Sequence, residues 1–169
     1  HRIIEKGRIY NMATLLENWR NLAYGNGLDD KQREQLWTGY FTIEKGIYEQ
    51  ILTNPAEVVS GTVKELADKY QTEVLIMTGF LDGINESLKG YENPIETMEE
   101  DTQVNLDYDK EKLYYNMVGA KADWLYELPQ WKEIYSEEEL KKLYKEQKES
   151  TTIRKEKKIG RNDPCWCGS

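Results

Sequence analysis

Two cysteines one residue apart are the side chains of this chain best suited to chemistry. Cys165 and Cys167 are its only cysteines, and they lie in the segment Arg-Asn-Asp-Pro-Cys-Trp-Cys-Gly-Ser at 161–169. Two thiolates at this spacing can hold one soft cation from a tight turn, and Gly168 gives that turn conformational freedom. A structural zinc ion takes four ligands in a closed tetrahedral site. The pattern predicts half of a zinc site, which needs two further ligands that this chain lacks.

The segment 161–169 resembles the opening of the SEC-C motif, the zinc-binding module at the C-terminus of the SecA translocation ATPase and of many small bacterial proteins. Trp166 stands where that family usually has proline. The segments LENWRNLAYG (16–25) and KADWLYELPQW (121–131) also resemble the body of stand-alone bacterial SEC-C proteins. In the family, a Gly-Lys-Lys-rich stretch leads to a final Cys-Cys or Cys-His pair, so the resemblance implies a chain interrupted inside the motif.

The resemblance further implies that the C-terminal motif docks to a protein or ribosomal partner, as the SecA motif docks to the chaperone SecB. The expected function is a non-enzymatic zinc adaptor linked to protein export or translation. Basic residues before the cysteines are expected to assist docking electrostatically. These residues are Arg154, Lys155, Lys157, Lys158 and Arg161.

Two other interpretations of the cysteines stay open. Nearby basic residues lower thiol pKa values, so the pair fits a redox-active dithiol. The pair also fits two free thiols on a frayed tail. Only the zinc interpretation predicts a metal that a chelator can remove.

The first eleven residues look unlike the rest of the chain. The chain begins with His1, whereas Met12 opens a segment that reads like a natural start, and residues 5–8 could be the translation of a purine-rich ribosome-binding site. We therefore expect residues 1–11 to be a translated leader or a remnant of expression, and exclude them from fold reasoning.

Charge is distributed unevenly along the chain. Residues 12–140 carry 11 Lys and Arg against 26 Asp and Glu, whereas residues 141–161 carry 9 against 3. An acidic body is a poor binder of nucleic acid, while a basic tail can contact phosphates. The sequence has neither an apolar run near the ~20 residues of a membrane span nor a signal peptide, and thiols suited to metal fit a reducing compartment. We expect a cytoplasmic protein.

Hydrophobic periodicity predicts an all-α fold, a bundle of about five or six helices over residues 12–145. The first helix carries Trp19 and ends at Gly25, and the second carries Tyr40 on its apolar face. Gly39 and Gly46 indicate close helix packing or a bend in that second helix. The expected N-terminal caps are Asp29 with Gln32, Thr62 with Glu65, Thr72 alone, Asp109 alone, and Ser136 with Glu139.

A loop, a further helix and a linker complete the expected organisation. Residues 90–109 are acidic and non-periodic, which predicts a loop of about 20 residues. A helix from Asp109 to Leu128 follows, with Pro129 breaking it. Residues 146–160 keep no apolar period and are expected to form a flexible basic linker to the partial zinc knuckle at 161–169.

Missing residue types exclude most familiar enzymes. His1 is the only histidine, so no histidine-based triad or proton shuttle operates in the body, and the scattered glycines form no phosphate loop. An enzyme that uses the acidic segment 92–111 with a divalent metal remains an alternative, with Asp107 and Asp109 as candidate ligands. No EF-hand glycine is in register there, because Lys110 occupies its position.

A DNA-binding regulator with a helix-turn-helix at residues 62–83 is the other alternative. Its second helix, residues 72–82, has no Lys or Arg to neutralise phosphates, which favours a packing hairpin. Aromatic residues around Pro129 indicate either core packing or a recognition surface, and core packing is favoured because Trp124 continues the stripe of Leu113 and Met117. These aromatic residues are Trp124, Tyr126, Trp131 and Tyr135.

Overall fold

The computed structural model describes the backbone of residues 2–5, 8–11 and 13–162, and the side chains of residues 13–151. The chain divides into two compact units, His1–Lys110 and Glu111–Ser169. The boundary falls inside the stretch 12–145, which the sequence analysis treats as one helical domain.

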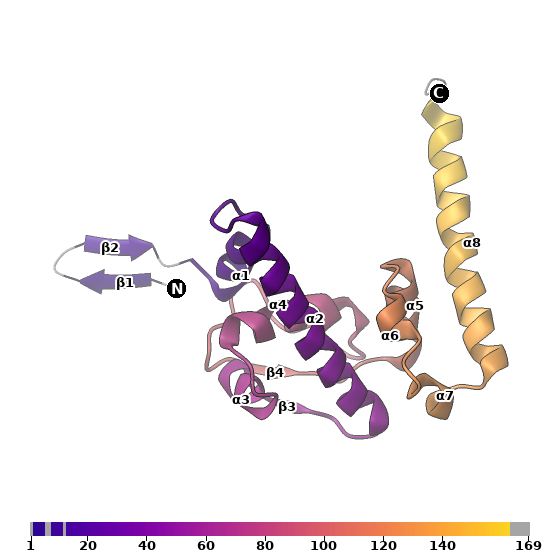
Figure 1. Ribbon diagram of the computed structural model, residues 1–169, viewed down its shortest axis with the longest axis horizontal. Coiled ribbons are helices and arrows are strands. Elements are labelled where there is room, and N and C mark those ends of the chain that lie inside the picture. The colour runs from indigo at the N-terminus through magenta and orange to yellow at the C-terminus, as the bar shows by residue number, and fades with distance from the viewer. Residues whose placement is uncertain (1, 6–7, 12, 163–169) are drawn as a thin grey trace. The chain divides into compact units, whose positions relative to one another are not determined.

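The first unit holds most of the secondary structure (Figure 1). Strand β1 (Arg2–Glu5) pairs antiparallel with β2 (Arg8–Asn11), with Arg2 opposite Asn11. Strand β3 (Ser60–Thr62) pairs antiparallel with β4 (Gln103–Asn105), with Ser60 opposite Asn105. In chain order its elements are β1 (Arg2–Glu5), β2 (Arg8–Asn11), α1 (Leu15–Tyr24), α2 (Asp30–Thr53), β3 (Ser60–Thr62), α3 (Val63–Lys69), α4 (Val74–Ile84), the 3₁₀ turn η1 (Asn85–Ser87) and β4 (Gln103–Asn105).

In the second unit, the regular elements that the structure describes are all helices, joined by short turns (Figure 1). Its elements are α5 (Lys110–Gly119), which begins at the boundary, α6 (Asp123–Tyr126), α7 (Trp131–Ile134) and α8 (Glu137–Asn162). The prediction of a mostly helical chain is confirmed. The described residues form eight α-helices, where five or six were expected, and these helices are divided between two units. Helices α6 and α7 are single turns.

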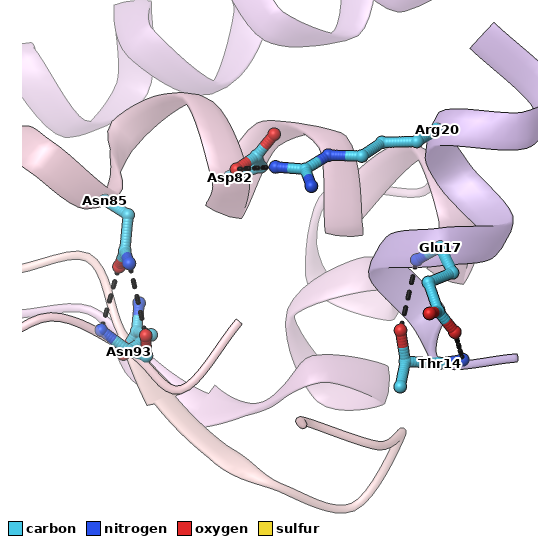
Figure 2. Close-up of polar contacts among 6 residues, drawn as sticks. All are labelled: Thr14, Glu17, Arg20, Asp82, Asn85 and Asn93. Carbon is cyan, nitrogen blue, oxygen red and sulfur yellow. Dashed lines mark hydrogen bonds and ion pairs between the residues drawn. The ribbon is translucent and has the colours of Figure 1, made fainter. Parts of the chain in front are cut away.

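Capping boxes begin several helices where the sequence predicts them. In each box the cap side chain accepts from the backbone N–H three residues on, and that residue's side chain accepts from the cap N–H. The predicted boxes that form are Asp29 with Gln32, Thr62 with Glu65, and Ser136 with Glu139. A fourth box, which the sequence analysis does not anticipate, joins Thr14 and Glu17 at the start of α1 (Figure 2).

One core cluster of the first unit forms where α1 packs against α4 and α2. Trp19 of α1 is 3% exposed, and its ring centroid lies 5.1 Å from that of Tyr40 in α2. Gly79 of α4 is the point of closest approach, since a Cβ there would lie 2.5 Å from Cε2 of Trp19. The absence of a side chain at Gly79 therefore sets how closely α1 and α4 approach.

Gly39 and Gly46 do not play the packing role that the sequence analysis gives them. A Cβ built at either position in α2 would meet nothing within 4 Å. Composition alone could not distinguish these open positions from Gly79, because the difference lies in the facing helix.

The segment 90–109, expected to be a loop, contributes strand β4 to the small sheet. Val104 is buried between less buried neighbours, as a strand with one covered face requires. A separate, isolated antiparallel bridge joins Leu88 and Tyr108. The predicted loop is wrong at these residues because a three-residue strand is too short to show alternation.

One predicted helix end and one predicted helix cap are also wrong. The predicted helix 109–128 ends at Gly119, where Lys121 adopts φ 59° and Ala122 N–H donates to the Met117 carbonyl at 3.0 Å. Gln71 does the same after α3 with φ 56°, and there Thr72 N–H donates to the Ala67 carbonyl at 2.9 Å. Both are Schellman-type ends with a non-glycine residue in the left-handed position. Thr72 closes α3 in this way and does not cap α4, which begins at Val74.

The segment 146–160, expected to be a linker without secondary structure, lies within α8. This helix continues to Asn162 because Glu, Lys, Gln and Arg are strong helix formers even without an apolar stripe. A Lys145–Glu149 pair at 4.0 Å adds a small i,i+4 contribution. The absence of an apolar period therefore did not exclude a helix here, and the expected linker without secondary structure is wrong.

Substituting Gly79 tests the contact between α1 and α4. Gly79→Ala forces a methyl group into the Trp19 ring and should lower the free energy of unfolding by about 1–3 kcal/mol. Gly39→Ala is the matched control, because it adds the same methyl group to a helix with open space and should raise stability by about 0.5–1 kcal/mol. Urea denaturation of both variants measures the difference, and equal effects would contradict the packing described here.

Candidate functional site

The predicted zinc ligands Cys165 and Cys167 lie outside the described residues, as does Gly168. The zinc site and its partial knuckle therefore stay predictions. Within the described side chains, no group of three or more His, Cys, Asp or Glu residues is placed to hold a metal ion.

The basic residues predicted to assist docking belong to the last turns of α8. Helical geometry of about 100° per residue places positions 154, 157, 158 and 161 within roughly 100° of one another on one helix face. Position 155 lies outside this arc, and Glu156 falls on the opposite side. The same face, followed back along α8, contains Leu143 and Gln147, which are buried in the second unit.

The proposed helix-turn-helix corresponds to α3 and α4, and its second helix is a core element. Met77, Phe80 and Leu81 of α4 are at most 1% exposed. Arg20 of α1 pairs with Asp82 on this helix at 3.7 Å (Figure 2). A recognition helix has to present side chains to the DNA groove, whereas the face of α4 is packed against α1 and α3.

The acidic segment 92–111 is held by a relay of asparagine amides. The Asn85 side chain donates to the Asn93 carbonyl at 3.1 Å and accepts from the Asn93 N–H at 2.8 Å (Figure 2). The Asn93 side chain repeats this pattern on Asn105, donating at 2.8 Å and accepting at 2.9 Å. Asn85 and Asn93 are 3% and 4% exposed. The side chains of Asn85 and Asn93 thus form the paired hydrogen bonds to backbone N–H and C=O groups that a neighbouring strand would otherwise form.

The candidate metal ligands of this segment already have structural roles. Asp107 lies 3.9 Å from the Lys89 ammonium, and its N–H donates to the Asn105 side chain at 2.8 Å. The N–H of Asp109 donates to the Ser87 carbonyl at 2.8 Å. Tyr108 between them donates its hydroxyl to the Ile51 carbonyl at 2.8 Å. These contacts hold residues 107–109 against Ile51, Ser87 and Lys89.

The aromatic residues around Pro129 divide between core and surface. Trp131 is 1% exposed and donates its indole N–H to the Leu125 carbonyl at 3.1 Å, so it is a core residue. Trp124 is 42% exposed, and its expected place on the core stripe is wrong. The helix break at Gly119 rotates α6 away from the register of α5, which explains why Trp124 no longer follows Leu113 and Met117.

A cavity of about 580 Å³ opens within the second unit beside these aromatic residues. We name it the tyrosine groove, and its uncharged lining is Tyr114, Tyr126, Leu128, Trp131, Leu140 and Tyr144. The Tyr114 ring centroid lies 5.0 Å from that of Trp131, and the Tyr126 centroid lies 5.8 Å from that of Tyr144. Both pairs are edge-to-face, so rings from α5, α6, α7 and α8 meet at one cavity.

Two tyrosine hydroxyl groups of the groove, those of Tyr114 and Tyr126, have a raised pKa. Burial is the main cause that raises the pKa of Tyr114 and of Tyr126, and neighbouring Tyr144 and Glu127 raise both further. Two acids and two bases complete the lining, namely Glu127, Lys132, Glu137 and Lys141. Tyr126 and Trp131 stand out in the sequence around Pro129, but Tyr114 and Tyr144 could not be placed beside them, because this needs the fold of α8 against α5.

No helix in the described part of the chain is both long and apolar enough to cross a membrane. Comparisons with family models, with curated proteins and with solved structures give no match for this chain.

Replacing Asn93 tests the relay. Asn93→Asp keeps the shape but removes the N–H donor to the Asn105 carbonyl and buries a charge, so it should destabilise the protein by about 3 kcal/mol. Asn26→Asp adds the same charge at an exposed position and should change stability by less than about 0.5 kcal/mol. Protonation restores the donor, so the difference between the two variants in urea denaturation should shrink on acidification. A constant difference would argue against a hydrogen-bonding role.

Alkaline pH tests the burial of Tyr108. Burial raises the pKa of Tyr108 from 10.0 to about 12, so the unfolded chain loses this proton at lower pH than the folded protein does. Its contribution to stability is complete below pH 10.0 and is lost as pH rises through about 12. Tyr108→Phe should cost about 1 kcal/mol at neutral pH through the lost bond to Ile51 and should flatten the decline in this window. An unchanged pH slope in denaturation curves would refute the assignment.

Proposed function

We propose that this protein is a non-enzymatic zinc-binding adaptor whose C-terminal SEC-C motif docks to a protein or ribosomal partner. The observation that carries the proposal is the sequence of the segment 161–169, which resembles the SEC-C motif. In this resemblance Cys165 and Cys167 correspond to two thiolate ligands of zinc. Zinc coordination by thiolates would fold this short segment, since such modules gain their structure from the metal.

The geometry of α8 supports the proposal by the way it would present the motif. A continuous helix of 26 residues is roughly 39 Å long and carries the chain away from the core of the second unit. Four basic positions on one face precede the cysteines. Cations at the base of a docking motif attract an acidic or phosphate-bearing surface, and the attraction decreases once added salt shortens the Debye length below about 8 Å.

Metal binding is the first test. Cobalt(II), a spectroscopic substitute for zinc, should give thiolate-to-metal charge-transfer absorption with the full chain, and a chelator should abolish it. Two thiolates fill half of the shell, so we expect weak binding with buffer or a second chain completing it. Cys165→Ser and Cys167→Ser should each lose the absorption, whereas Ser169→Ala should retain it. The same spectrum in the cysteine variants would remove the basis of the proposal.

Docking is the second test, with purified bacterial ribosomes and purified SecB as probes. The zinc-loaded chain should co-sediment with ribosomes or bind SecB, and replacement of either cysteine should weaken that binding. Replacing Arg154, Lys157, Lys158 and Arg161 together by Ala should make the residual binding insensitive to salt. Binding to neither probe, or binding that the cysteine and basic variants leave unchanged, would contradict the adaptor role.

A further inference from the structure

We propose that Asn26, in the turn between α1 and α2, is a covalent modification site at which water converts the side-chain amide into a carboxylate. Asn26 is followed by Gly27, and both residues are exposed in the bend 25–28, between the end of α1 at Tyr24 and the start of α2 at Asp30. Asparagine before glycine is a turn sequence in which the backbone is least hindered. The inference uses neither the cysteines nor the basic end of α8, so it stands independently of the proposed zinc function.

The reaction needs a backbone nitrogen that can attack the side chain. Hydroxide removes the proton from the Gly27 N–H, and the nitrogen then bonds to the side-chain carbonyl carbon of Asn26. The bond from this carbon to the amide nitrogen breaks, and ammonia leaves with a proton taken from water. The resulting five-membered succinimide takes up one water molecule and opens to aspartate or to isoaspartate, in which the main chain runs through the former side chain. No group is oxidised or reduced, and water is the only reagent.

The structure leaves the attacking nitrogen free. Within the described part of the chain, neither the Gly27 N–H nor the Asn26 side chain makes a hydrogen bond. A Cβ built at Gly27 would meet nothing within 4 Å, so neighbouring atoms do not hinder ring closure. The Arg33 guanidinium instead holds the carbonyls on either side, that of Gly25 at 2.8 Å and that of Leu28 at 3.3 Å. Asn26 and Gly27 therefore lie between two held carbonyls without hydrogen bonds of their own.

The other asparagines whose side chains the structure describes lack one of these requirements. Asn54 and Asn93 precede proline, which has no N–H. The N–H that follows Asn105 donates to the Val59 carbonyl at 2.8 Å, and the side-chain amide of Asn85 is held by Asn93. The remaining three lie inside helices, where the next N–H is bonded within the helix, and these are Asn18, Asn21 and Asn116.

Incubation of the full chain in warm, mildly alkaline buffer, followed by peptide mass spectrometry, tests the proposal. The peptide that contains Asn26 should gain the mass of an amide-to-acid conversion, separate into two products, and accept methyl groups from a protein isoaspartate methyltransferase. The rate should rise with pH, because the attacking nitrogen must lose a proton. Unfolding the chain in guanidinium chloride should change the rate by less than about threefold, since the fold does not shield this turn.

Substitution of the glycine provides the matched comparison. Gly27→Ala should slow the conversion about tenfold, because a methyl group beside the attacking nitrogen raises the barrier. Gly27 has no left-handed φ and has open space around it, so this variant should fold like the original chain. Gly39→Ala, equally open but preceded by Thr38, is the control and should keep the original rate. Equal rates in the two variants, conversion at another asparagine, or an amide that stays intact in the folded chain while the unfolded chain reacts would each overturn the proposal.

Discussion

The asparagine relay from Asn85 through Asn93 to Asn105 is the interaction on which the irregular half of the first unit depends. Between α4 and α5 the chain buries Leu88, Met98, Val104, Leu106 and Tyr108, but it has little regular secondary structure to pair its backbone groups. The relay gives this segment two-point backbone pairing from side chains, at distances from 2.8 to 3.1 Å. Such amides are buried at a cost unless both donor and acceptor are satisfied, and here both are.

This use of polar groups bears on the function of the acidic segment. Asp107 and Asp109, which composition presents as candidate ligands, have backbone and side-chain contacts to Lys89, Asn105 and Ser87 of the first unit. The segment resembles a structural connection with a negatively charged exterior more than a catalytic loop. The proposed function accordingly rests on the C-terminal thiolates, with the helical units as the support that presents them.

Much of the local structure could be predicted from the sequence, because its signals are short-range. The capping boxes at Asp29, Thr62 and Ser136 form as expected, since each needs only a side chain and a backbone group three residues apart. The helix end at Lys121 could not be predicted, because a left-handed residue that is not glycine leaves no compositional mark. The pairing of β3 with β4 and the contact of Trp19 with Gly79 depend on tertiary structure, and neither has a local signal.

The candidate site residues also separate into those that a local sequence signal could place and those that only the tertiary structure places. Trp131 is buried as core packing predicts, while Trp124 is exposed because the break after Gly119 changes the register between α5 and α6. The tyrosine groove needs four helices to meet, so single residues such as Tyr126 could be noted in the sequence but not assembled into a site. The cysteine motif is the reverse case, in which the sequence carries the whole argument.

X-ray absorption at the zinc edge, recorded on the zinc-loaded full chain, tests the central claim most directly. The account predicts sulfur scatterers at about 2.3 Å from zinc. A first shell of nitrogen and oxygen alone would contradict the assignment of Cys165 and Cys167 as ligands.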